Sequence, residues 1–146
     1  MRKAARAIII ENDRLLVMHR NKYGSQYFTL VGGRVNDDET PEQALMREVK
    51  EETGLRIRAG RPVYIEEHAA PHNIQYIYLC EVESHGDVVI QEASEESEMN
   101  KYGANTHQPH WVAKGAFANL PFRTPQLQAA IIKALKKGFP ESPIKL

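Results

Sequence analysis

Residues 33–55 read GRVNDDETPEQALMREVKEETGL, and one of the two helices expected in the chain lies within this stretch. It predicts a helix that begins after Thr40, a favourable N-cap residue. Pro41 suits the first helical position, and Gln43 completes a capping box with Thr40. The helix is expected to end just before Gly54, a residue that readily adopts the left-handed conformation that closes many helices.

Three carboxylates of this helix, Glu48, Glu51 and Glu52, are spaced three or four residues apart and therefore share one rim. One interpretation is a solvated acidic surface, because repulsion of about 0.2–0.5 kcal/mol per adjacent pair is small. The other is a cation site, since Mg²⁺ prefers oxygen ligands. The rim lies in the C-terminal half of the helix, where the helix dipole disfavours anions, and this favours the cation site.

Two neighbouring features of the sequence fit a cation site. Arg47 precedes Glu51 by four residues and can hold that carboxylate in place, although the same spacing is common in ordinary surface ion pairs. The Gly32–Gly33 pair lets the backbone, with its carbonyl oxygens, approach the helix rim without an intervening Cβ.

These residues resemble the Nudix box of the Nudix hydrolases. Gly33, Glu39 and the run Arg47-Glu48-Val49-Lys50-Glu51-Glu52-Thr53-Gly54-Leu55 meet every defining position within 23 residues. One departure is Val31, where many members have a proline that would stiffen the loop. The resemblance implies a hydrolase that uses Mg²⁺ or Mn²⁺ to cleave a diphosphate linked to another group, X.

The resemblance also implies roles for individual residues. Glutamates matching Glu48, Glu51 and Glu52 bind the metals or activate water, and the carbonyl matching Gly32 often completes the metal shell. The arginine matching Arg47 orients a glutamate. The remaining box positions are chiefly structural, and they are Gly33, Glu39 and Gly54.

The rest of the chain predicts a single domain, residues 1–146, of the α/β (α+β) class: an α/β/α sandwich with a mixed sheet between helices. A second helix is expected from about Pro125 to Lys137, capped by Thr124 and closed by Gly138. A polar turn, residues 11–14, separates the first two expected strands. The expected strands are Ala5–Ile10, Leu15–His19, Tyr27–Val31, Pro62–Glu66, Ile74–Val82, Val88–Ile90 and Trp111–Val112.

The resemblance to the Nudix family also implies candidate site residues outside the box. Nudix enzymes often use a further glutamate about forty residues after the box, where this chain has Glu92, Glu95, Glu96 and Glu98. Glu98 or Glu96 is the favoured candidate, as a metal ligand or general base, against the alternative of a solvated loop, and Glu98 is the one expected to bind the metal. Arg20 and Arg34 are candidates for binding substrate phosphate, and a surface arginine at a strand end is the alternative for Arg20.

Composition restricts the partners of the chain. Nineteen basic and nineteen acidic residues cancel, so no net charge attracts the protein to DNA or to a membrane surface. The acidic residues are concentrated in residues 36–98, which suits multivalent cations better than phosphodiesters. Cys80, a single cysteine, excludes an internal disulfide. No long apolar run is present, and a cytoplasmic location is expected.

Three functional hypotheses follow. The leading one is hydrolysis of a nucleoside diphosphate linked to X, such as a nucleoside triphosphate or a nucleotide sugar. A dinucleoside polyphosphate or the 5′ end of RNA is an alternative substrate, and RNA would favour a basic track leading to the site. The alternative from another class is a non-catalytic nucleotide-sensing Nudix domain, although all the box glutamates are present here. A homodimer is also considered, because many relatives are dimers.

Overall fold

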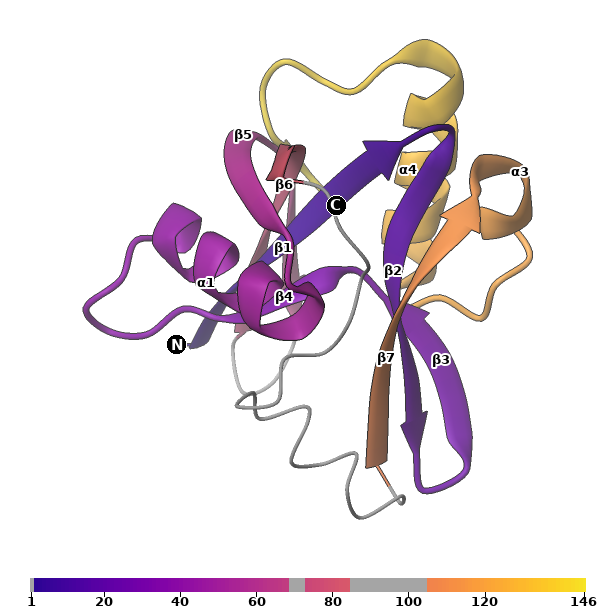
Figure 1. Cartoon of the computed structure of the whole chain (residues 1–146). Coiled ribbons are helices and arrows are strands. Elements are labelled where there is room, and N and C mark those ends of the chain that lie inside the picture. Colours follow the sequence, from indigo (N-terminus) through magenta and orange to yellow (C-terminus); the bar gives the residue numbers. More distant parts are fainter. Residues whose placement is uncertain (1, 69–72, 85–104) are drawn as a thin grey trace.

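The computed structural model describes residues 2–68, 73–84 and 105–146. Strands and two long helices make up most of this part of the chain (Figure 1). In chain order, the elements are β1 (Arg2–Glu11), β2 (Arg14–Lys22), β3 (Ser25–Thr29), β4 (Val31–Arg34), α1 (Pro41–Thr53), β5 (Arg56–His68), β6 (Asn73–Ser84), β7 (Asn105–Ala113), α3 (Lys114–Phe117), α4 (Pro125–Lys137) and β8 (Ile144–Lys145).

The strands form a mixed sheet with β1 near its centre. The order is β3-β2-β1-β6-β5-β8, while β4 pairs with β1 and β7 pairs with β2. Strands β1 and β6 are parallel, whereas β2 and β4 both run antiparallel to β1. The expected mixed sheet is confirmed.

Helices cover both faces of the strands, and the alternating side chains of β1 explain why. Ala5, Ala7 and Ile9 point into a core with Leu45 and Val49 of α1. Ile8 faces the other way and belongs to a second core that includes Leu127 and Ile131 of α4. Figure 1 accordingly shows α1 and α4 on opposite sides of β1. This two-sided burial with a period of two is what a strand between two helical layers requires.

Strand β4, which carries Gly32 and Gly33, lies beside the first half of β1. Here β4 is the neighbour of β1, with Ala5 opposite Gly33 and Arg6 opposite Gly32. The expected single strand Tyr27–Val31 is in fact two strands, β3 and β4, that separate at Leu30. Leu30 is buried in the second core, and the chain changes its pairing partner there from β2 to β1.

Other expected elements are present but longer. The strand expected at Pro62–Glu66 is the centre of β5, and that expected at Trp111–Val112 lies within β7. Backbone pairing with β6 and β2 extends these two strands beyond the expected residues. The added residues are largely polar, so a hydrophobicity pattern does not reveal them. The expected strand Val88–Ile90 lies outside the described residues. Within the described ranges, no helix is long and apolar enough to span a membrane.

Candidate active site

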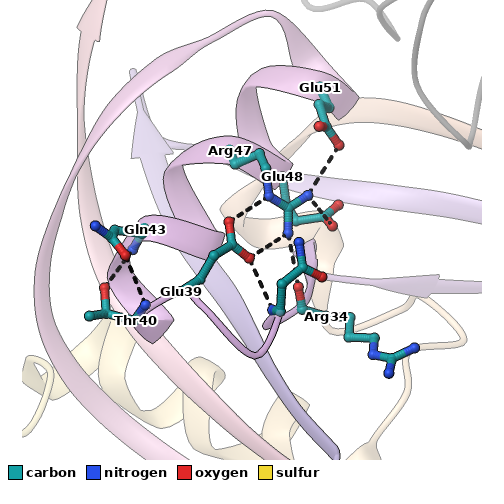
Figure 2. Close-up of polar contacts among 8 residues, drawn as sticks. Arg34, Glu39, Thr40, Gln43, Arg47, Glu48 and Glu51 are labelled. Carbon is teal, nitrogen blue, oxygen red and sulfur yellow. Dashed lines mark hydrogen bonds and ion pairs between the residues drawn. The ribbon is translucent and has the colours of Figure 1, made fainter.

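Both ends of α1 are fixed by the hydrogen bonds that the sequence predicts. The Gln43 backbone N–H donates to Thr40 Oγ1 at 3.1 Å, and the Thr40 N–H donates to Gln43 Oε1 at 2.9 Å (Figure 2). At the other end, Gly54 is left-handed, with φ of 79°, and its N–H donates to the Lys50 carbonyl at 2.9 Å. The glutamates of α1 are therefore presented by a helix with defined ends.

The two glycines of β4 bring the backbone close to these glutamates. A Cβ on Gly33 would lie 2.5 Å from Cδ of Glu48, so the Glu48 carboxylate fills the space that a side chain would take. The backbone N–H of Gly32 donates to Glu52 Oε1 at 2.8 Å. Two of the three candidate carboxylates thus lie directly against the glycine loop, residues 32–39.

Arg47 connects the glycine loop with the helix rim. Its Nε and Nη2 donate to the two carboxylate oxygens of Glu39 at 2.7 and 2.9 Å, a bidentate pair. Its Nη1 donates to Glu48 at 2.9 Å and more weakly to Glu51 at 3.4 Å, and Nη2 also reaches the Arg34 carbonyl at 3.1 Å (Figure 2). One guanidinium thus joins three carboxylates and the Arg34 carbonyl.

Pairing changes the pKa of both Glu39 and Arg47. The hydrogen bonds from Arg47, supported by the Asn36 backbone N–H, lower the pKa of Glu39 to about 2. The same contact with Glu39, followed by that with Glu48, raises the pKa of Arg47. Both groups therefore stay charged at neutral pH, and Arg47 is a permanent cation beside the carboxylates.

The expected contact of Arg47 with Glu51 is present, but Glu39 and Glu48 take the shorter bonds, because the residues between β4 and α1 bring Glu39 to the guanidinium. The rim is also not uniformly solvated. Glu52 is only 2% exposed, whereas the Glu51 side chain is 42% exposed. A buried carboxylate bonded to a glycine N–H is not what a solvated acidic surface would contain.

The side chains of the other predicted site residues lie away from this cluster or outside the described residues. The Arg34 side chain extends away from Arg47 in Figure 2, although its carbonyl accepts a bond from it. Arg20, on β2, donates to Asn105 at 2.9 Å and lines a separate cavity with Arg6. The predicted loop glutamates lie outside the described residues, and they are Glu92, Glu95, Glu96 and Glu98.

Sequence reasoning missed Arg6, which contacts the glycine loop from β1. Its Nη1 donates to the carbonyl of Gly32 at 3.0 Å and to that of Leu30 at 3.3 Å. A signal was available, because Arg6 interrupts a strand in which Ala5, Ala7 and the following residues are buried. A charged residue in such a strand needs a partner, and the loop carbonyls provide it.

The residues beside Gly32 and Gly33 fit a divalent cation in donor chemistry. Glu48 and Glu52 lie against the glycine pair, Glu51 follows on the same helix, and all offer the oxygen ligands that Mg²⁺ and Mn²⁺ prefer. In the part of the chain that the structure describes, no three acidic, histidine or cysteine side chains are already grouped as a metal site. A cation here would therefore compete with Arg47 for Glu48 and Glu51.

Comparisons with known proteins agree with the fold and the box. Residues 1–130 match the NUDIX domain, so the chain belongs to the Nudix family. The NAD-capped RNA hydrolase NudC of Shigella flexneri is 33% identical over 82 residues, which are 56% of this chain and 32% of that protein. The chain thus spans about a third of the length of that curated relative.

Solved structures show the same fold. The solution structure of the E. coli ORF135 protein superimposes with a TM-score of 0.69 at 22% identity, covering 94% of this chain and 92% of that one. An ADP-ribose pyrophosphatase from Streptococcus suis 89-1591 gives a TM-score of 0.65 at 20% identity, covering 99% and 96%. These similarities establish the architecture and leave the substrate to be argued from the site.

Proposed function

We propose that this chain is a metal-dependent hydrolase that cleaves the diphosphate bond of a nucleoside diphosphate linked to a group X. The observation that carries the proposal is the seating of Glu48 and Glu52 against the Gly32–Gly33 backbone, with Arg47 bonded to Glu48. The names of the similar proteins support the substrate class. NAD and ADP-ribose, which those names include, each contain a nucleoside diphosphate linked to a second group.

The metal would be held by carboxylates of the box. Glu48, Glu51 and Glu52 are the proposed ligands for Mg²⁺ or Mn²⁺, and Glu98 is a further candidate that lies outside the described residues. The Gly32 carbonyl is also a proposed ligand. It already accepts one bond from Arg6, so the cation would use its second lone pair. When bound, such a cation neutralises charge on the diphosphate and lowers the pKa of a coordinated water.

The residues of the chain have two tasks in this reaction. Arg47 keeps the Glu48 carboxylate in place, and through Glu39 it keeps the glycine loop next to the helix. A carboxylate of the cluster accepts a proton from the attacking water, and Glu51 and Glu48 are the candidates besides the buried Glu52. In this proposal the arginine positions the catalytic groups, and a glutamate accepts the proton.

A panel of substrates tests the proposal. Nucleoside triphosphates, nucleotide sugars, ADP-ribose, NADH, dinucleoside polyphosphates and a 5′-triphosphate RNA oligonucleotide would each be incubated with Mg²⁺ or Mn²⁺. Excess chelator is the control. We expect hydrolysis of at least one class, lost on chelation, while circular dichroism shows that the fold persists, since nothing in the described core depends on a metal.

Two outcomes would contradict the proposal. Hydrolysis at full rate in excess chelator would refute the metal assignment. Binding of a nucleotide without hydrolysis of any substrate would instead support the non-catalytic sensing domain. Light scattering on the same preparation measures whether the proposed homodimer forms.

A further inference from the structure

Two imidazole side chains from distant parts of the chain meet on the neighbouring strands β2 and β7. His19 lies near the end of β2 and His110 lies in β7, and their ring centres are 5.9 Å apart. The strands pair antiparallel, with Val17 opposite His110 and His19 opposite Gln108. The two histidines are therefore diagonal neighbours on one face of the sheet.

This histidine pair is separate from the proposed active site. Side chains alternate along β2, and Arg20, the residue after His19, lines a cavity together with Arg6, which donates to the Gly32 carbonyl. His19 lies instead on the face of β2 that carries Val17, a buried residue of the second core. An ion held by the two imidazoles would thus be on the other face of β2 from this cavity.

The ring of His19 is held from two sides. It stacks on the ring of Phe28 in β3, with centres 4.8 Å apart and planes inclined by 26°. Its Nε2 donates to Oε1 of Gln26 at 3.1 Å. An amide oxygen can only accept, so the neutral ring carries its hydrogen on Nε2 and its lone pair on Nδ1. Histidines that bind metals are commonly held in this way, by a bond from the second ring nitrogen.

The ring of His110 is accessible. This side chain is exposed, and among residues 2–68, 73–84 and 105–146 neither of its ring nitrogens takes part in a hydrogen bond. One imidazole of the pair is therefore held in place, and the other is open to solvent and to a ligand.

The separation of the rings suits a shared metal ion. Zn²⁺ lies about 2.0–2.1 Å from a ligating imidazole nitrogen, and hence about 3.2 Å from the ring centre. Two rings on one ion then have centres about 5.2 Å apart at a tetrahedral angle, and at most about 6.4 Å apart. The observed 5.9 Å lies within this limit. Because His110 is exposed, a small rotation of its side chain can supply the remaining approach.

The donor atoms select the class of ion. Imidazole nitrogen suits Zn²⁺, Ni²⁺ and Cu²⁺, whereas Mg²⁺ prefers oxygen. In the described part of the chain, no third histidine, cysteine or acidic side chain is grouped with the pair. Water would complete the coordination, and the exposed Gln108, opposite His19, offers an amide oxygen on the same face.

We propose that His19 and His110 bind a divalent transition-metal ion of the Zn²⁺, Ni²⁺ and Cu²⁺ class, which links β2 to β7. The site is additional to the Mg²⁺ or Mn²⁺ site proposed at the box, and it does not depend on the hydrolase activity. The two imidazoles come together only when β2 and β7 are paired. The ion therefore binds the folded chain in preference to the unfolded chain and stabilises it.

Calorimetry tests whether the pair binds a metal. Ni²⁺ would be titrated into protein without a polyhistidine tag, in excess Mg²⁺, which competes for the box carboxylates but not for imidazole. The samples are the wild type, His19→Gln, His110→Gln and, as the matched control, His68→Gln on β5. We expect the affinity to fall about tenfold or more in the first two variants and less than about twofold in His68→Gln.

Spectroscopy and thermal unfolding identify the ligands and the effect of the ion. Electron paramagnetic resonance of the wild type with one equivalent of Cu²⁺ should show coupling to two imidazole nitrogens, and that of His110→Gln to one. Zn²⁺ at ten times its Kd should raise the Tm of the wild type by about 3 °C or more. The Tm of His110→Gln should change by less than about 1 °C at the same Zn²⁺ concentration, and its metal-free Tm should match that of the wild type because His110 is exposed.

Three outcomes would overturn this inference. They are absence of Ni²⁺ binding to the wild type in excess Mg²⁺, equal affinity in the wild type and His110→Gln, and a Cu²⁺ spectrum without imidazole coupling. If His19→Gln did not fold, because its ring packs on Phe28, His110→Gln would decide the matter alone.

Discussion

Alanine at Gly33 should damage the site while leaving the fold nearly intact. The added methyl group would lie 2.5 Å from Cδ of Glu48, whereas ordinary contact begins at about 3.4 Å. The carboxylate would thus have to move by about 1 Å, and a shift of that size in a catalytic group costs on the order of 10²-fold in rate. The obstacle is the end of a flexible side chain, and Gly33 has no left-handed φ. The free energy of unfolding should therefore fall by less than about 1 kcal/mol.

Gly32→Ala provides the matched control one residue away. Its Cβ would lie 2.1 Å from the backbone oxygen of Ala5, and the Gly32 φ of +137° is strained for any residue with a side chain. Backbone cannot yield as a side chain does, so β4 would have to separate from β1. We expect a loss of about 3 kcal/mol or more in the free energy of unfolding.

Urea unfolding and turnover, measured on the wild type and both variants, distinguish these effects. The expected result is a Gly33→Ala protein that unfolds near the wild-type midpoint but turns over slowly. A Gly33→Ala protein with wild-type turnover would show that the position of Glu48 is not critical. If Gly33→Ala unfolded as early as Gly32→Ala, the contact with Glu48 would be part of the rigid packing instead.

Two further predictions concern the Glu39–Arg47 pair. Arg47→Ala should lower the free energy of unfolding by only about 1 kcal/mol or less, because the pair is partly exposed, but should lower kcat/KM about tenfold or more. Equal turnover per folded molecule would make Arg47 purely structural. The lowered pKa of Glu39 means that its contribution to stability is fully present above about pH 4.5 and is lost as the pH falls toward 2. Urea unfolding across that range should show a smaller loss for Glu39→Gln than for the wild type, and parallel curves would contradict the pairing.

The sequence was a good guide wherever the interactions are local. The capping box of Thr40 and Gln43, the left-handed Gly54 and the Thr124 cap of α4 all involve residues within a few positions of one another, and all are confirmed. The strand expected at Ala5–Ile10 is likewise confirmed within β1, and it lies between two helical layers. These features depend on backbone geometry and periodicity, which a sequence displays directly.

Contacts between distant segments could not be predicted in the same way. The box suggested Arg47 with Glu51 because helical spacing is visible, whereas the stronger pair with Glu39 depends on the path of the intervening loop. Arg6 meets the Gly32 carbonyl across two strands, and Arg123 reaches Tyr27 from a segment 96 positions later. Such pairs are set by strand order and register, which one sequence does not specify.

The most direct test of the account compares Glu52→Gln with the wild type. The amide oxygen of glutamine can still accept the Gly32 N–H, so the free energy of unfolding of the metal-free protein should change by less than about 1 kcal/mol. Glutamine binds Mg²⁺ less well and cannot take a proton, so hydrolysis of the best substrate should fall at least about 10²-fold. If Glu52→Gln hydrolysed every substrate of the panel at the wild-type rate, the assignment of the site to the box glutamates would be wrong.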